Sequence, residues 1–124
     1  MTLEEEKTSL DRGEQVLIKR SGDVLVQDLE SADNSWTRFK GLMFRSSLPK
    51  QGGLWLTPCS SIHMMFMRFP IDVIWLNSNR VVLKVSSGVA PWYGMAFCWN
   101  AWTALELPAG NAEAVQVGDE LIRE

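Results

Sequence analysis

The chain is poor in the residues from which metal centres and nucleophilic sites are built. Its 124 residues include one His and two Cys, Cys59 and Cys98. A zinc site needs four ligands, usually brought together by short spacings such as CxxC or HxxxH, and the sequence contains neither. A site built from Cys59, His63 and Cys98 would still lack a fourth ligand. We therefore expect no bound metal and no cofactor.

Clustered positive charge, long apolar runs and an export signal are also missing. Twelve Lys and Arg against 15 Asp and Glu give a net charge of −3, which argues against a nucleic-acid-binding surface. No apolar run approaches the roughly 20 residues that span a bilayer, and no signal-peptide apolar segment follows Met1. We therefore predict a cytoplasmic protein with no nucleic-acid partner and no membrane span. In a reducing compartment both cysteines should be free thiols.

The length predicts one domain, and periodic sequence begins near Gln15. Residues 1–14 include the acidic run Glu4–Glu6 and lack apolar periodicity, so we expect a disordered acidic tail. The chain is 46% hydrophobic, which is enough to build one core. Residues 15–124 are therefore predicted to form a single β-rich domain.

The rest of the chain is organised around the stretch from Cys59 to Leu76. Pro70 divides this stretch, because proline has no N–H for a strand ladder. Before it, residues 62–67 are apolar on both faces, which predicts a central strand covered on both sides. After it, residues 71–76 form a second strand that places Asp72 beside aliphatic side chains. Since an unpaired buried carboxylate is destabilising, Asp72 should have a donor partner or lie at a strand end open to water.

Further short β-prone runs recur about every ten residues and predict a mainly β fold. One helix, about 35–46, is predicted from the N-cap cluster at 33–35 and from apolar positions at helical spacing. One helical turn is expected at 112–117, and a loop at 88–94. The sequence thus predicts a small antiparallel sandwich or a partly open barrel with one principal helix. The other expected strands are 16–18 and 24–26 as a hairpin, 54–56, 81–85 as a hairpin with 71–76, 99–107 and 120–122.

Five ordered blocks resemble the family catalogued as domain of unknown function number 192. The resemblance covers nearly the whole chain, from about Gln15 to Ile122. It implies a compact, mostly β fold with few helices. It implies no established activity and carries over no catalytic residues. The blocks are Arg38–Arg45 with Leu48, Ile62–Met67 with Pro70–Ile74, Pro91–Trp92, Leu105–Gly110, and Gly118–Asp119.

Seven residues are candidates for a binding site, and each also has a structural interpretation. Histidine titrates near neutral pH, so His63 suits a general base or metal ligand, although the commoner role is a core residue bonded to the backbone. Met67 belongs to a Met cluster that either fills the core or offers an adaptable or copper-binding surface. Asp72 is either a structural anchor or a site carboxylate. Trp92 and Tyr93 lie on the 88–94 loop, where they either bind a ligand or cap the core.

Arg38 and Arg45 complete the candidate list. They lie seven residues apart on the predicted helix, so both project to nearly the same side. They could hold a carboxylate or phosphate, or pair with Asp72 or Glu106, or lie on a solvated face.

We predict a non-enzymatic binding or interaction module, a monomer or weak dimer, whose partner is a small molecule or a protein. Its site should lie where His63, Asp72 and the Pro91–Tyr93 loop converge. The alternative is a small hydrolase or transferase in which His63 is the base and Asp72 orients it. A Cys59–His63 nucleophilic pair is also conceivable, but no oxyanion-hole motif adjoins it. The enzyme stands second because no nucleophile motif, phosphate loop or paired-carboxylate pattern is present.

Overall fold

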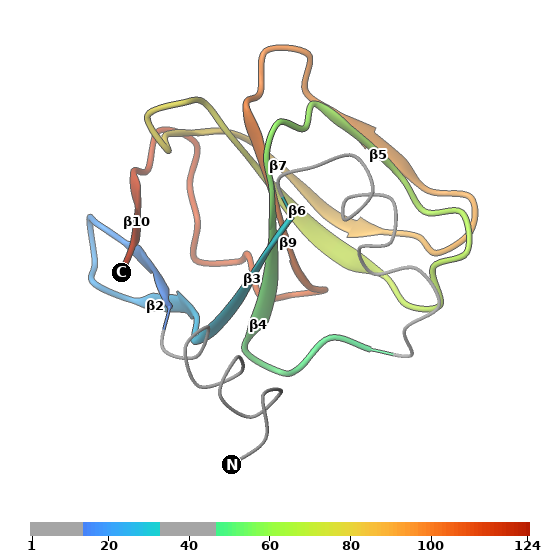
Figure 1. Cartoon of the computed structure of the whole chain (residues 1–124), viewed down its shortest axis with the longest axis horizontal. Helices are drawn as coiled ribbons and strands as arrows, with labels where there is room; N and C mark the ends of the chain where they lie inside the picture. Colours follow the sequence, from blue (N-terminus) through green and yellow to red (C-terminus); the bar gives the residue numbers. More distant parts are fainter. Residues whose placement is uncertain (1–13, 33–46) are drawn as a thin grey trace.

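The computed structural model describes residues 14–32 and 47–124 (Figure 1). This part of the chain is built from short strands and contains no helix, which confirms the mainly β prediction. Residues 1–13 of the predicted tail and the helix predicted at 35–46 lie outside the described residues. The strands are β1 Val16–Ile18, β2 Val24–Val26, β3 Asp28–Ala32, β4 Gly52–Leu56, β5 Ser61–His63, β6 Ile71–Leu76, β7 Val82–Val89, β8 Met95–Phe97, β9 Thr103–Pro108 and β10 Leu121–Arg123.

The described strands form three open sheets, none of them closed into a barrel. A five-stranded sheet has the order β3-β4-β9-β6-β7, a three-stranded sheet the order β10-β1-β2, and β5 pairs with β8 alone. Pairing is antiparallel except between β3 and β4, which are parallel. All six residues of β6 are buried, because this strand lies between β9 and β7 and is covered on both faces.

The five-stranded sheet is the middle layer and separates two cores. Side chains alternate along β6, so Ile71, Val73 and Trp75 lie in one cluster, which also contains Ile62 of β5. Ile74 lies in a second cluster, built with side chains of β1, β2 and β10. In Figure 1, β5 accordingly lies on one side of the middle sheet and β2 and β10 on the other. The three layers make the fold sandwich-like.

Both predicted hairpins are confirmed. β1 and β2 pair antiparallel, and β6 returns as β7 after a turn over Asn77–Arg80. The Asn77 side-chain oxygen accepts the N–H groups of Asn79 and Val81 at 2.9 and 3.0 Å, which explains the sharp turn. The strands predicted at 54–56 and 120–122 are also found, as β4 and β10, with ends shifted by one or two residues.

The predicted central strand over residues 62–67 is wrong. β5 ends at His63, and the N–H of Met67 donates to the carbonyl of Met64 at 2.9 Å, which closes a turn. β5 belongs to an outer two-stranded ribbon, so only one of its faces meets the core. His63 is exposed and Met65 is 52% exposed. An apolar pattern on both faces of this segment therefore does not mean burial on both.

Other differences occur where local sequence gives little strand or helix signal. Strands β3 and β8 were not predicted, and β7 extends into the expected 88–94 loop. β9 begins at Thr103 instead of Trp99, and the N–H of Trp102 donates to the carbonyl of Leu76 at the end of β6 (2.8 Å). Residues 112–117 form successive turns and not a helical turn.

A candidate binding surface

Large apolar side chains are exposed together on and around the β5–β8 ribbon. Of the ten large hydrophobic residues exposed in the described chain, eight lie there, and the other two are Val24 and Val117. We call these eight residues the aromatic face. They are Met65, Phe66, Trp92, Tyr93, Met95, Phe97, Trp99 and Trp102, with exposed fractions from 37% to 93%.

The pairing register of the ribbon decides which side chains are exposed. Ile62 of β5 lies opposite Ala96 of β8, and both are buried against the middle sheet. Because side chains alternate along a strand, Met95 and Phe97 must then point outward. They are 79% and 64% exposed. His63 lies opposite Met95 and is exposed as well, so the ribbon places it within the aromatic face.

Backbone hydrogen bonds fasten the 90–94 loop to the end of β5. The N–H of Met64 donates to the carbonyl of Gly94, and the carbonyl of Met64 accepts the N–H of Trp92, both at 2.9 Å. Within the loop, the N–H of Gly94 donates to Ala90 at 3.0 Å. The rings of Phe66 and Trp92 meet edge to face, with centroids 5.6 Å apart. The two aromatic loops therefore form one connected surface.

Two residues of this surface have strained backbones. Phe66 and Trp92 both have φ of 68°, a left-handed conformation that aromatic residues rarely adopt. Gly94 has no room for a side chain, because a Cβ there would lie 2.2 Å from the carbonyl oxygen of Ala90. Backbone strain of this kind costs roughly 1–3 kcal/mol per residue and is concentrated at functional sites. The observed strain therefore motivates a functional hypothesis for this surface.

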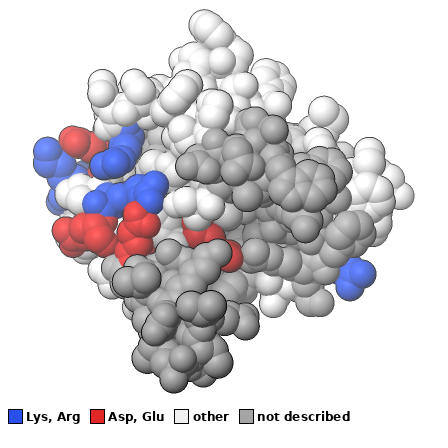
Figure 2. Space-filling view, viewed as in Figure 1, with Lys and Arg blue, Asp and Glu red and all other residues white. Residues whose placement is uncertain are grey.

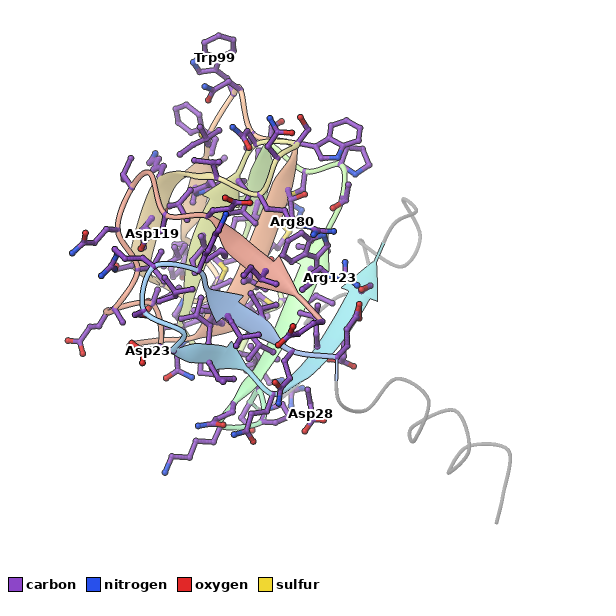
Figure 3. The ribbon with its side chains drawn as sticks, turned by 90° about the vertical axis from the view of Figure 1, so that its left-hand side faces the viewer. Asp23, Asp28, Arg80, Trp99, Asp119 and Arg123 are labelled. Atoms are coloured by element: carbon purple, nitrogen blue, oxygen red, sulfur yellow. The ribbon has the colours of Figure 1, made fainter. Side chains whose placement is uncertain are left out.

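The tryptophans at the far end of the face border a surface hollow. The N–H of Cys59 donates to the carbonyl of Trp102 at 3.0 Å, which holds this loop against the start of β5. A hollow of about 350 Å³ lies between Pro58, Ser60, Trp99 and Trp102. Figure 3 shows Trp99 at the tip of its loop, pointing away from the body of the protein. An 84% exposed Trp contributes little to the core.

Both cysteines lie near the aromatic face as free thiols. Cys59 is partly buried, and its thiol donates to the carbonyl of Ser61 at 3.3 Å. Cys98 is buried, and its thiol donates to the side-chain oxygen of Asn100 at 3.2 Å. Among the described residues, no three His, Cys, Asp or Glu side chains are grouped so as to hold a metal ion.

Cationic side chains accompany the aromatic face. The ammonium group of Lys84 lies 5.2 Å from the centre of the Phe97 ring and donates to the Phe97 carbonyl at 2.9 Å. This is a cation–π arrangement at the rim of the face. Arg68 is exposed two residues after Phe66.

Asp72 is a buried anchor on the opposite side of the middle sheet. It is 2% exposed, and its carboxylate accepts three backbone N–H groups, from Gly88 (2.9 Å), Gly110 (2.9 Å) and Ala112 (3.1 Å). Of the two alternatives expected for Asp72, a donor partner is confirmed over a strand end open to water, and the donors shown are backbone N–H groups. It shares the side of β6 that carries Ile74, away from the β5–β8 ribbon.

The structure separates the seven predicted site residues. His63, Trp92 and Tyr93 come together on the aromatic face. Met67 is 4% exposed and packs in the core beneath them, and Asp72 lies across the middle sheet. In the described chain, no hydrogen bond joins His63 to Asp72. Arg38 and Arg45 lie outside the described residues.

Sequence reasoning missed six members of the aromatic face. The residue type alone does not reveal that Phe97 is exposed while Trp75 is fully buried. One signal was available, because residues 92–102 contain five large aromatic residues and no charged residue. The missed members are Met65, Phe66, Met95, Phe97, Trp99 and Trp102.

The opposite outer layer carries ion pairs. We call the exposed side of the β10-β1-β2 sheet and its turns the charged face. Lys19 pairs with Glu120 at 3.3 Å, and Arg20 with Asp119 at 2.8 Å. The hydrogen bond from Arg20 holds the pKa of the Asp119 carboxyl below its usual value, and the N–H of Gln116 adds to this. Figure 2 shows charged side chains gathered at the left of the view, where β2 and β10 lie in Figure 1, while the described residues in the upper part of the view carry no charged side chain.

On this side of the protein, two arginine side chains lie close to one indole ring. The guanidinium groups of Arg123 and Arg80 lie 4.9 and 5.9 Å from the ring centre of Trp55. Arg123 also pairs with Glu14. Trp55 is only 7% exposed, so here the cations cover an aromatic ring that is already part of the core.

Within the described part of the chain, no helix is long and apolar enough to cross a membrane. Two crystal structures share the fold. One is a protein of unknown function from Novosphingobium aromaticivorans DSM 12444, with a TM-score of 0.76, 23% identity, and coverage of 88% of this chain and 82% of that one. The other, described as a proposed transcription regulator from Sinorhizobium meliloti 1021, has a TM-score of 0.77, 24% identity, and coverage of 89% and 92%.

Sequence relatives point to one family. A UPF0127 protein of Pyrococcus furiosus is 39% identical over 101 residues, which cover 76% of this chain and 84% of the relative. A UPF0127 protein of Thermococcus sibiricus is 31% identical over 110 residues, which cover 83% and 70%. The model of the family DUF192, described as "Uncharacterized ACR", matches residues 16–122. The chain therefore belongs to the DUF192 family.

Proposed function

We propose that this protein is a non-enzymatic binding module and that the aromatic face is its binding surface. The observation that carries the proposal is the gathering, on one region, of eight of the ten large apolar side chains that are exposed among the described residues. Single exposed apolar residues are ordinary, but a contiguous group of large ones marks an interaction site. A cytoplasmic location is part of the same proposal.

The exposed aromatic residues are not needed to fill the core. The middle sheet already buries Trp75 completely, and its indole N–H donates to the side chain of Ser86 at 3.0 Å. Tyr93 and Trp99 are 93% and 84% exposed, so their rings gain little from packing. An aromatic group that does not stabilise the fold is available for a partner.

The hydrolase or transferase alternative finds no support in the described residues. Both carboxylate oxygens of Asp72 accept backbone N–H groups, so the side chain holds two chain segments, at Gly88 and at residues 110–112. His63 lies on the other side of the middle sheet, beside Met95. A base and its orienting carboxylate must be within hydrogen-bond reach, and an orienter fixed in this way cannot serve His63.

Amide NMR with a probe panel tests the proposal. The panel contains apolar fragments, aromatic-rich peptides and oligosaccharides, each titrated into the full chain. We expect shift changes at Phe66, Trp92, Tyr93 and Phe97. The variant Trp92→Ala should weaken these titrations, whereas Val117→Ser, at an exposed apolar position outside the face, should not.

Three results would contradict the proposal. The first is shift changes centred on the charged face, and the second is unchanged titrations in Trp92→Ala. The third is turnover of ester or phosphate substrates that is lost in His63→Ala, which would restore the enzyme alternative.

A further inference from the structure

We infer that the aromatic face docks on a membrane surface that contains anionic lipids. This inference rests on the proposed function, because it names the partner of the same binding surface. Two observations carry it: the aromatic side chains of the face are exposed, and the acidic residues of the sequence lie mostly outside the part of the chain that forms the face.

Acidic residues are nearly absent from the part of the chain that forms the aromatic face. Residues 34–105 contain seven Lys or Arg and a single acidic residue, Asp72. The other 14 acidic residues lie in 1–33 and 106–124. Asp72 is buried and bound to three backbone N–H groups, so it presents no negative charge beside the face. The net charge of −3 therefore does not describe this surface.

The layered fold converts most of this sequence asymmetry into distance. The exception is Glu106, which shares the side of β9 that carries Ala104 of the ribbon-side core and is 7% exposed. The aromatic face lies on one side of the middle sheet, and the ion pairs of β1, β10 and their turns lie on the other. Stacked sheets are about 10 Å apart, so the two outer layers are separated by about 20 Å. That exceeds the screening length of about 10 Å at ordinary ionic strength. The acidic groups of the charged face would therefore repel an anionic membrane only weakly.

The side chains of the face match the boundary between headgroups and acyl chains. Trp and Tyr prefer this boundary because each combines an apolar ring with a polar N–H or O–H. Met95 and Phe97 supply purely apolar area at the centre of the ribbon, 79% and 64% exposed. Lys84 at the rim, 5.2 Å from the Phe97 ring, can reach lipid phosphates, and exposed Arg68 follows Phe66 by two residues.

Two other partners fit the same surface less well. Single-stranded nucleic acid is held by a basic groove that follows many phosphates, whereas in the described part of the chain the cations that accompany the eight apolar side chains are Arg68 and Lys84. A second copy of this chain, docked through the same face in a two-fold dimer, would bring Arg68 and Lys84 of both copies into one interface, and the eight residues of the aromatic face supply no acidic side chain to pair with them. An anionic surface is the partner that satisfies both the apolar and the cationic groups.

Vesicle co-sedimentation with the full chain provides the test. Vesicles of phosphatidylcholine alone are compared with vesicles that also contain phosphatidylserine. We expect binding to the second kind, weakened by added salt. The double variant Tyr93→Ser/Trp99→Ser should lower partitioning at least about tenfold, because each large apolar side chain that leaves water contributes a factor of that order. Arg68→Gln should lower it about fivefold.

Matched controls lie elsewhere on the protein. Val117→Ser removes an exposed apolar side chain outside the face, and Lys19→Gln removes an exposed cation from the charged face. Both should bind vesicles as the wild type does. Far-UV circular dichroism and thermal melting check that each variant is folded, which the exposure of the substituted side chains leads us to expect.

Each other outcome overturns the inference in a distinguishable way. Vesicle binding that Tyr93→Ser/Trp99→Ser leaves unchanged excludes the aromatic face. No vesicle binding, with probes still bound at the face by NMR, refutes the lipid partner but leaves the proposed function standing. Binding of a single-stranded oligonucleotide, or self-association lost in the double variant, would replace lipid with that partner. Failure of both vesicles and probes removes the proposed function as well.

Discussion

The aromatic face and the charged face cover the same middle sheet in opposite ways. The β5–β8 ribbon buries one apolar pair and exposes aromatic residues, whereas the β10-β1-β2 sheet presents ion pairs such as Lys19–Glu120 to water. Exposed ion pairs add little stability, so neither outer surface is explained by folding energy alone. The comparison shows that the two cores hold the fold while the outer surfaces are free to differ.

Among the changes that compare the two sides of the middle sheet, the largest effect should come from removing the Asp72 carboxylate, which anchors the side away from the β5–β8 ribbon. In Asp72→Ala the N–H groups of Gly88, Gly110 and Ala112 lose their acceptor while buried or partly buried. We expect a loss of roughly 3 kcal/mol or more, since hydrogen bonds to a charged group contribute about 1.5–3 kcal/mol each when removal leaves partners unsatisfied. Urea unfolding at pH 7 measures it.

Asp72→Asn refines this result, because its amide offers one oxygen and adds an N–H group that faces other donors. Asp28→Asn, at an exposed position, is the control and should leave the urea midpoint nearly unchanged. An equal midpoint for wild type and Asp72→Asn would mean that the carboxylate is not a structural anchor.

A methyl group added to a loop of each outer layer should destabilise the protein by different amounts, with the larger loss in the aromatic loop. In Gly94→Ala the new Cβ would meet the Ala90 carbonyl oxygen at 2.2 Å, so the aromatic loop has to move. We expect a loss of about 2 kcal/mol and weaker binding at the aromatic face. Gly22→Ala in the β1–β2 turn meets nothing within 4 Å, and its φ of +77° alone should cost about 1 kcal/mol. Thermal melting that ranks Gly22→Ala as the more harmful change would contradict this.

Acid should remove the stabilisation that the Arg20–Asp119 pair of the charged face provides. The folded pKa of Asp119 is lowered by Arg20, so the stability from this group is present above the unfolded Asp pKa of about 4. It is lost as pH falls through the folded pKa. Urea midpoints measured from pH 7 to pH 2 should therefore fall less steeply in Asp119→Asn than in the wild type. Parallel curves would show that the pair makes no contribution.

The smallest effect on stability should come from the aromatic face itself. Trp99→Ser removes a ring that is 84% exposed, so the free energy of unfolding should change by no more than about 0.5 kcal/mol. Trp75→Ala, at a fully buried position, should cost about 3–5 kcal/mol. Denaturant unfolding of the two variants decides whether Trp99 is retained for stability. A large loss in Trp99→Ser would make the aromatic face a structural element.

Hydrophobic alternation and turn residues were enough to predict much of the sheet. Strand β6 and its hairpin with β7 carry continuous apolar residues around the Asn77–Arg80 turn, so local sequence and tertiary structure agree. Strand β3, Asp28–Ala32, has polar residues at three of five positions and forms only because it pairs with β4. Such a strand is specified by its partner and not by its own sequence.

The candidate surface was predicted only in part, because exposure depends on the layer to which a strand belongs. Trp92 and Tyr93 were found from their place on a loop. Met67 resembled its neighbour Met65 in the sequence, yet the turn after β5 buries one and exposes the other. The approach of His63 to the 90–94 loop follows from the pairing of β5 with β8, which sequence did not reveal.

Strand β1 lies between β2 and β10, which joins the beginning and the end of the described chain. Gln15 and Glu124 exchange two backbone hydrogen bonds, at 2.9 and 3.0 Å. During synthesis, β1 and β2 can pair early, but one edge of β1 has no partner until β10 has left the ribosome. An unpaired strand edge is a site for association with other chains. This sheet is therefore completed only after the strands between β2 and β10 have been made, and a chain interrupted before Leu121 should be prone to aggregate.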